Sequence, residues 1–280
     1  MAERVNPVKI KKILGDSQTL THDLIVVEEP LEIRVGYGLE AQRQQVTITV
    51  TMRTPDDDEH LCLGFLYNEG VISSSKEVLS AKYCNNNVEE DGGDNVMRVE
   101  LASDIGFKPN DYKRNFYTNS SCGVCGKASI EHVKQVCEPV ANTDLKVSVK
   151  TILGLEQVLE STQDIFKHTG GLHACGLFDS HGKILLYKED VGRHNALDKL
   201  IGSLLLSNLL PADNNILLLS GRISFELVQK AVRAGIPIIA AIGAPSSLSI
   251  ALAKECGVTI IGFLKERGFN IYTGFDRIIE

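Results

Sequence analysis

The chain has 280 residues, of which 43% are hydrophobic and 23% are charged, and its mean hydropathy is close to zero. This composition is typical of a globular protein that forms its own core without a disulfide or metal scaffold. Acidic side chains (36) outnumber basic ones (29), which argues against a nucleic-acid-binding protein. The sequence has no apolar run near the roughly 18 residues of a membrane span. Seven cysteines are few for a secreted disulfide framework, so we expect a cytoplasmic protein with reduced thiols.

The charge divides the chain into two parts. Residues 1–116 carry 13 basic and 20 acidic side chains, whereas residues 117–280 carry 16 of each. We therefore expect a strand-rich N-terminal subdomain over 1–116 and an α/β domain over 117–280. In the first part, Thr54-Pro55-Asp56-Asp57 marks the start of one helix, which ends near Gly70. Apolar patterns predict strands over 24–27, 31–35, 46–52, 76–84 and 96–101.

The second part alternates longer helices with strands. Helices are predicted over 128–137, 152–161, 194–206, 225–234 and 248–256. Strands are predicted over 172–178, 183–187, 216–219, 237–241 and 258–263. The alternation from residue 194 onward predicts right-handed crossovers and a parallel sheet with helices on both faces.

A cysteine-containing loop, residues 120–127, lies between a predicted strand and a predicted helix. Its sequence is Ser-Ser-Cys-Gly-Val-Cys-Gly-Lys, with the thiols at Cys122 and Cys125. The adjacent helix start and Lys127 both favour the thiolate form, which is the form that attacks sulfur. Redox or sulfur chemistry is one interpretation, and a metal site or an inert loop remain alternatives.

Two established cysteine motifs fit this loop poorly. The pair does not lie early in a βαβ unit, as it does in thioredoxin-like proteins. A zinc deaminase needs H-x-E followed by P-C-x-x-C, and neither half is present. Zinc in general needs two more ligands, yet Cys137, Cys175 and Cys256 are single, so we assign no metal ligands. We expect the cysteines outside the loop to be buried bystanders.

Three further segments combine glycine with polar residues at predicted helix starts. They are Gly192-Arg193-His194, Ser220-Gly221-Arg222 and Gly243-Ala244-Pro245-Ser246-Ser247. Free N–H groups at a helix start bind phosphate, and arginine strengthens such a site, so a nucleotide or phosphate-bearing ligand is one interpretation. Helix capping and packing are the other.

These motifs resemble the FdhD family over nearly the whole chain. The pieces occur in that family's order and include Thr54-Pro55 through Asp58, residues 121–127, Thr169 through His173, and Asp190 through Lys199. The resemblance implies a cytidine-deaminase-like three-layer α/β/α domain with a strand-rich N-terminal subdomain. It also implies a homodimeric sulfurtransferase that is required for formate dehydrogenase activity.

The resemblance also implies a mechanism and its partners. Cys122 and Cys125 are expected to accept sulfur from a cysteine desulfurase as a persulfide and to pass it to a bis-molybdopterin guanine dinucleotide cofactor. The cofactor then enters the catalytic subunit of formate dehydrogenase. A non-enzymatic chaperone that protects and delivers the molybdenum cofactor is the alternative, and such a carrier should still deliver cofactor after Cys→Ala substitution.

The family's cofactor-binding stretch corresponds to residues near the end of this chain. It comprises Phe263, Leu264, Lys265, Glu266, Arg267 and Gly268. Lys265 stands where the family commonly has arginine, so we expect Arg267 to provide the stronger phosphate contact. We further expect five residues to surround one guanine-nucleotide pocket that GDP can occupy as a mimic: Arg193, His194, Arg222, Ser246 and Ser247.

Overall fold

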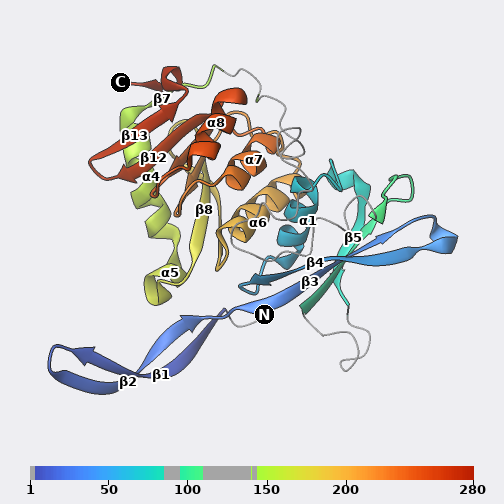
Figure 1. Cartoon of the computed structure of the whole chain (residues 1–280), viewed down its shortest axis with the longest axis horizontal. Helices are drawn as coiled ribbons and strands as arrows, with labels where there is room; N and C mark the ends of the chain where they lie inside the picture. Colours follow the sequence, from blue (N-terminus) through green and yellow to red (C-terminus); the bar gives the residue numbers. More distant parts are fainter. Residues whose placement is uncertain (1–3, 85–94, 110–139, 141–143) are drawn as a thin grey trace.

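The computed structural model describes residues 4–84, 95–109, 140 and 144–280. These residues form a mixed α/β structure in which a four-stranded sheet and a six-stranded sheet lie on either side of helices α1 (Asp58–Asn68) and α6 (Arg193–Leu206) (Figure 1). The expected boundary at residue 116 falls outside the described residues. None of the helices in the described part of the chain has the length and apolar character needed to cross a bilayer.

The four-stranded sheet belongs to the N-terminal half. Its order is β4-β3-β6-β5, in which β3 and β6 are parallel and the other neighbours are antiparallel. Apolar side chains on one face of this sheet pack against α1. Each of these elements is predicted by the sequence to within a few residues. The strands are β3 (Glu29–Tyr37), β4 (Gln44–Arg53), β5 (Val78–Tyr83) and β6 (Val96–Leu101), with short 3-10 turns at Glu40–Gln42 and Ser75–Glu77.

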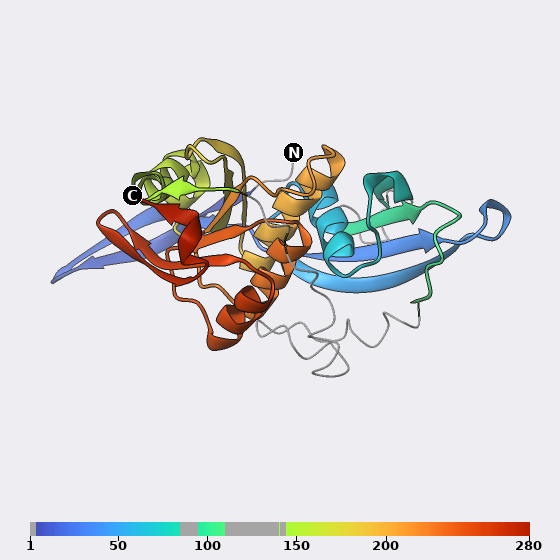
Figure 2. The same cartoon turned by 90° about the horizontal axis from the view of Figure 1, so that it is seen from above.

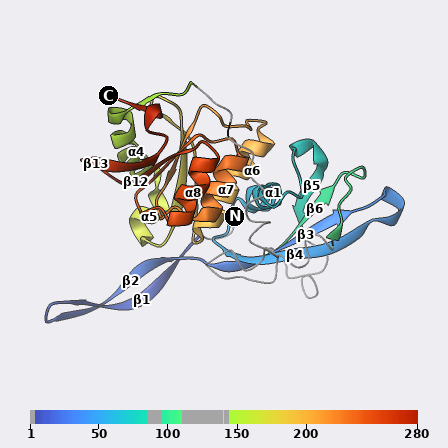
Figure 3. The same ribbon diagram turned by 45° about the horizontal axis from the view of Figure 1, so that its top comes forward.

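The six-stranded sheet belongs to the C-terminal half and has the order β13-β12-β11-β10-β8-β9. Its strands are β8 (His173–Phe178), β9 (Ile184–Asp190), β10 (Ile216–Leu219), β11 (Ile238–Ala241), β12 (Thr259–Lys265) and β13 (Gly268–Thr273). One face packs against α6, α7 (Phe225–Arg233) and α8 (Ser247–Glu255), and the other against α4 (Val149–Thr162) (Figures 1 and 3). Helices therefore cover both faces, as the sequence predicts.

The parallel sheet predicted for the strands that alternate with helices is confirmed, because β10, β11 and β12 pair in parallel. The other three strands are antiparallel to their neighbours. The reason is the length of the connections, because β8–β9 and β12–β13 are joined by short turns, and a short turn joins antiparallel strands only. The sequence pattern does not predict β13, helix α5 (Asp164–Thr169), or a small parallel pair of β7 (Val147–Ser148) and β14 (Ile278–Ile279), beside a 3-10 turn at Phe275–Arg277.

A long hairpin at the N-terminus is predicted from the sequence only at its end, where the expected strand 24–27 overlaps its second strand. Strands β1 (Val5–Leu14) and β2 (Ser17–Val26) pair along all ten residues each and extend away from the rest of the molecule (Figures 1 and 3). Almost all of their side chains are exposed on both faces. Strand prediction relies on one buried face, and this hairpin has none, so its sequence lacks the usual alternation.

The two halves meet where α1 crosses α6, in the middle of the molecule (Figure 2). A Cβ atom at Gly64 would lie 1.9 Å from the carbonyl oxygen of Asp198, and one at Gly202 would lie 1.9 Å from that of His60. The two helix backbones are therefore in direct contact, which only glycine permits at these positions. This crossing holds α1, and with it the N-terminal sheet, against α6.

Candidate functional site at the strand ends

The candidate site lies at one edge of the six-stranded sheet. β9, β10 and β11 end at this edge, β8 begins there, and helices α6, α7 and α8 start from the loops that follow. Three helix N-termini therefore converge, each with backbone N–H groups that the helix itself does not use. In an open α/β sheet, this is the edge at which ligands bind.

Backbone hydrogen bonds join the loops at this edge into one surface, which we call the strand-end rim (residues 220–224, 242–246 and Phe263). The N–H of Gly243 donates to the carbonyl of Gly221 at 3.2 Å, and the N–H of Phe263 donates to the carbonyl of Gly243 at 3.1 Å. Ile223 donates to Ala244 at 3.1 Å. A Cβ at Gly243 would lie 2.8 Å from the Gly221 oxygen, so this close approach requires glycine. The backbone thus determines the shape of the rim.

The structure brings Arg193, Arg222, Ser246 and Ser247 to this edge. Arg193 is the first residue of α6, and a Cβ at Gly221 would lie 3.8 Å from its Cδ atom. The Arg222 side chain is exposed, as are both serines. Ser246 caps α8 by accepting a hydrogen bond from the N–H of Ser249 at 3.2 Å. Two cations therefore stand near three helix starts, which is an arrangement suited to a polyanion.

His194 lies at the same edge, and its side chain already contacts two residues at the start of α7. Its Nε2 atom is 3.0 Å from Oε2 of Glu226 and 3.3 Å from Oγ of Ser224, both at the start of α7. The sequence analysis did not identify these two partners. His194 thus links α6 to α7, which agrees with the packing interpretation and leaves any contact with a ligand a prediction.

The structure places the residues of the predicted cofactor-binding stretch, 263–268, in different environments. Phe263 has a φ of +54° and is 47% exposed, so its ring stands at the rim in a backbone conformation that is rare for a bulky residue. The Leu264 side chain is fully buried in the core beside α4, which leaves only its backbone to a ligand. Strained backbone clusters at functional sites, so Phe263 is the strongest candidate in this stretch.

Residues 265–268 form the turn between β12 and β13, and their side chains are exposed. Burial raises the pKa of Glu156 on α4. The positive charge of Lys265 lowers this pKa, and the negative charge of Glu266 raises it. The turn therefore lies beside α4. Arg267 and Gly268 complete it, so the two predicted cations are held on a hairpin tip rather than on the rim itself.

His173, which the sequence analysis quoted in a motif but did not assign to the site, lies against the rim. A Cβ at Gly221 would lie 3.4 Å from its Nδ1 atom. Burial lowers the pKa of His173, and the positive charges of Arg193 and His194 lower it further. Its surroundings thus favour the neutral form of the imidazole. The missing signal was topological, because the start of β8 reaches this edge only through its antiparallel pairing with β10.

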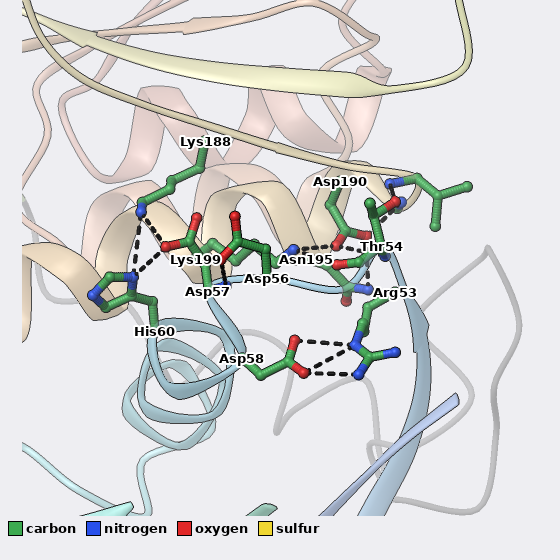
Figure 4. Close-up of polar contacts among 12 residues, drawn as sticks. Arg53, Thr54, Asp56, Asp57, Asp58, His60, Lys188, Asp190, Asn195 and Lys199 are labelled. Atoms are coloured by element: carbon green, nitrogen blue, oxygen red, sulfur yellow. Dashed lines mark hydrogen bonds and ion pairs between the residues drawn. The ribbon is translucent and has the colours of Figure 1, made fainter. Parts of the chain in front are cut away.

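A buried polar network, which we call the α6 clasp (Thr54, Asp190, Asn195 and Lys199), fixes the first turn of α6 to the end of β4 (Figure 4). Lys199 Nζ lies 2.7 Å from Asp190 Oδ2 and donates to the Thr54 carbonyl at 2.8 Å. Burial raises the pKa of the Asp190 carboxyl, and the ammonium of Lys199 is the main opposing influence. The clasp joins residues more than 130 positions apart in the sequence.

A second polar group holds the start of α1 (Figure 4). Asp56 and Asp57 both have positive φ, and Asp57 Oδ1 lies 2.9 Å from His60 Nδ1 and 2.7 Å from Lys188 Nζ. Burial alone would raise the pKa of Asp57, but the hydrogen bonds from His60 and Lys188 outweigh it and the pKa is lowered. These bonds stabilise a turn whose backbone is otherwise strained.

The predicted catalytic residues Cys122 and Cys125 lie outside the described residues, as do the predicted helix 128–137 and Cys137. Three other cysteines, Cys62, Cys175 and Cys256, are buried. Burial raises the pKa of the Cys62 and Cys175 thiols. Cys84 is partly exposed. Within the described ranges, no three His, Cys, Asp or Glu side chains gather as metal ligands.

Comparisons with known proteins identify relatives over almost the whole chain. The model of the FdhD/NarQ family matches residues 26–279. The chain is 50% identical over 260 residues to "Sulfur carrier protein FdhD" of Mycolicibacterium paratuberculosis, covering 91% of this chain and 92% of that protein. It is 43% identical over 276 residues to the protein of the same name from Sulfurisphaera tokodaii, covering 99% and 100%.

A solved structure is also similar. It is described as a putative formate dehydrogenase accessory protein from Desulfotalea psychrophila, and it matches with a TM-score of 0.73 at 26% identity, covering 99% of this chain and 100% of that one. The resemblance inferred from the motifs is therefore confirmed independently by sequence and by structure. The chain belongs to the FdhD/NarQ family.

Proposed function

We propose that this protein is a sulfurtransferase that acts in the maturation of formate dehydrogenase in the cytoplasm. Its relatives are named sulfur carrier protein FdhD, and the similar solved structure is described as a formate dehydrogenase accessory protein. The observation that carries the proposal is the sheet edge that bears the strand-end rim, where three helix N-termini, Arg193 and Arg222 form a surface suited to a phosphate-bearing ligand. The central sheet with helices on both faces also fits a cytidine-deaminase-like three-layer fold.

The sulfur donor in this proposal is the persulfide of a cysteine desulfurase. The Cys122 thiolate attacks the outer sulfur of that persulfide, the desulfurase thiolate leaves, and Cys122 becomes Cys–S–SH. Attack by the Cys125 thiolate on the inner sulfur then releases HS⁻ and leaves a Cys122–Cys125 disulfide. A thiol reductant must reduce this disulfide before the next cycle, since the released sulfide carries away two electrons.

The acceptor in this proposal is bis-molybdopterin guanine dinucleotide, bound as substrate before it enters formate dehydrogenase. Its pyrophosphates match the N–H groups and arginines at the rim, and Phe263 offers an exposed ring to a flat base. Lys265 and Arg267 on the hairpin tip provide further cations. The protein acts as a homodimer, with the desulfurase and the formate dehydrogenase catalytic subunit as its partners.

The test of sulfur transfer is mass spectrometry of the protein after incubation with a desulfurase and cysteine. We expect an adduct of about 32 Da on Cys122, which is one sulfur atom, and its loss in Cys122→Ala. Cys175→Ala is the matched control, because that thiol is buried and should carry no adduct. An adduct that persists on another cysteine when both loop cysteines are alanine would refute the assignment. Full delivery of active cofactor by that double variant would favour the chaperone alternative.

The test of the ligand site is calorimetric titration with GDP. Arg222→Ala should weaken binding by about 1.5–3 kcal/mol, the value of a hydrogen bond to a charged group, without lowering thermal stability, since its side chain is exposed. In purified protein, Arg267→Ala should retain less molybdopterin than Lys265→Ala, while the Cys122 persulfide still forms in both. Unchanged GDP affinity, or equal retention by wild type and the Lys265/Arg267 double variant, would contradict these assignments.

A further inference from the structure

The first turn of α6 lacks the usual helix cap. Its N-cap residue is Gly192, which has no side chain, so no side-chain oxygen at that position can accept a hydrogen bond from the helix start. Asp190, two residues upstream, fixes the N-cap residue itself, because its Oδ1 accepts from the N–H of Gly192 at 2.8 Å. The same oxygen accepts from Nδ2 of Asn195 at 3.1 Å. The two donors bracket Arg193 and His194.

The other oxygen of the Asp190 carboxylate faces the N-terminal half. Oδ2 accepts from the N–H of Thr54 at 3.2 Å and pairs with Lys199. Thr54 Oγ1 in turn accepts from the N–H of Val191 at 3.3 Å. Asn195 is fixed from the same side, since its Nδ2 also donates to the Met52 carbonyl at 2.8 Å. The residues on both sides of Arg193 and His194 are therefore held against the end of β4.

A buried ion pair is a costly way to join two halves of a protein. Asp190 and Lys199 have side chains that are 0% and 1% exposed, and well-packed apolar residues of similar size often replace such pairs without loss of stability. Stability alone therefore does not account for this carboxylate. Its directional hydrogen bonds do, because only an acceptor at position 190 can fix the Gly192 N–H and the Asn195 amide together.

We propose that Asp190 is a positioning residue, which fixes the first turn of α6 through Gly192 and Asn195 and thereby places Arg193 at the strand-end rim to meet the anionic ligand. The N-terminal sheet takes part in the site through Thr54, although it contributes no residue to the rim. The identity of the ligand rests on the proposed function, whereas the positioning itself does not.

Two double variants separate positioning from stability. Asp190→Asn with Lys199→Met and Asp190→Leu with Lys199→Met both remove the buried ion pair, and both are neutral. Asparagine keeps an oxygen that can accept from Gly192 and Asn195, whereas leucine, which has the same branching and number of heavy atoms, has none. Thermal unfolding comes first. The leucine variant leaves the Gly192 N–H without this acceptor, so we expect it to melt a few degrees below the asparagine variant, and both are compared at a temperature at which each is fully folded.

GDP affinity is the first readout. We expect the asparagine variant to bind GDP within about threefold of wild type and the leucine variant to bind about tenfold or more weakly, because two hydrogen bonds that orient the first turn are lost. A third variant, Asp198→Leu with Lys230→Met, removes another ion pair of α6 away from its first turn and should leave the affinity unchanged. Equal affinity of the asparagine and leucine variants would overturn the proposal.

The second readout needs no ligand. The pKa of His173 is lowered partly by Arg193 and His194, so displacement of the first turn should raise it. Both Asp190 variants lack the carboxylate charge, and an NMR titration of His173 therefore compares them directly. We expect a higher pKa in the leucine variant, and identical titration curves would overturn the proposal. If wild type binds no GDP, the proposed ligand is wrong, but this titration still decides the role of Asp190.

Discussion

Replacing Gly202 by alanine tests the contact between α1 and α6, on which the relation between the two halves depends. An ordinary carbon–oxygen contact is about 3.3 Å, and the new Cβ would lie 1.9 Å from the His60 carbonyl, so the helices must separate by more than about 1 Å. Such overpacking costs about 1–3 kcal/mol, and the atom displaced here is backbone, which argues for about 3. Alanine also raises helix propensity by about 1 kcal/mol. The expected net destabilisation is about 2 kcal/mol.

Gly154 provides the matched control. It lies within α4, and a Cβ there would meet no atom within 4 Å. The same substitution should therefore stabilise the protein by about 1 kcal/mol through helix propensity alone. In thermal unfolding, Gly202→Ala should lower the melting temperature by about 4–8 °C and Gly154→Ala should raise it by about 2–4 °C. If Gly202→Ala were as stable as wild type, the direct backbone contact would be refuted.

Three further predictions concern charges and thiols. Arg53→Ala should destabilise the protein by about 3–5 kcal/mol in urea unfolding, because it leaves the Asp58 carboxylate buried without its partner; a loss below 1 kcal/mol would contradict the buried pair. The Asp57 pKa is lowered in the folded state, so its contribution to stability is complete above about pH 3.8 and is lost as the pH falls further. Asp57→Asn should therefore reduce the loss of unfolding free energy as the pH falls below about 3.8, and an unchanged loss would count against this reasoning. Cys175 and Cys256 should resist alkylation at pH 8 in the native protein and react in urea, as peptide mass mapping can show; rapid native labelling would mean that they are not buried.

Much of the fold follows from periodicity in the sequence. β6 and β10 have their predicted bounds, and α1, α4 and α6 to α8 lie within a few residues of theirs, because each contributes a recognisable set of apolar side chains to a core. The N-terminal hairpin has no buried face, and the sequence analysis accordingly found only its last residues.

The candidate site was predicted only in part. Glycine, serine and arginine at the helix starts could be recognised locally, and the structure places Arg193, Arg222 and Ser246 at one edge of the sheet. Contacts across the chain could not be recognised in this way. Nothing in the sequence around Asp190 indicates that its carboxylate meets Thr54, since that contact depends on how the two halves pack.

At the strand-end rim, the backbone determines the shape of the surface, and exposed side chains determine its charge and hydrogen bonding. The loops of the rim are joined by backbone groups and by the closeness that Gly243 permits, while Arg222, Ser246 and Ser247 are exposed. Substitutions at Arg222 and Ser247 can therefore alter charge and hydrogen bonding while the frame keeps its geometry, whereas Ser246 also caps α8. Single substitutions of exposed side chains can adapt such a surface to a different anionic ligand. A substitution at Gly243 would instead change the shape of the rim and so affect the binding of every ligand.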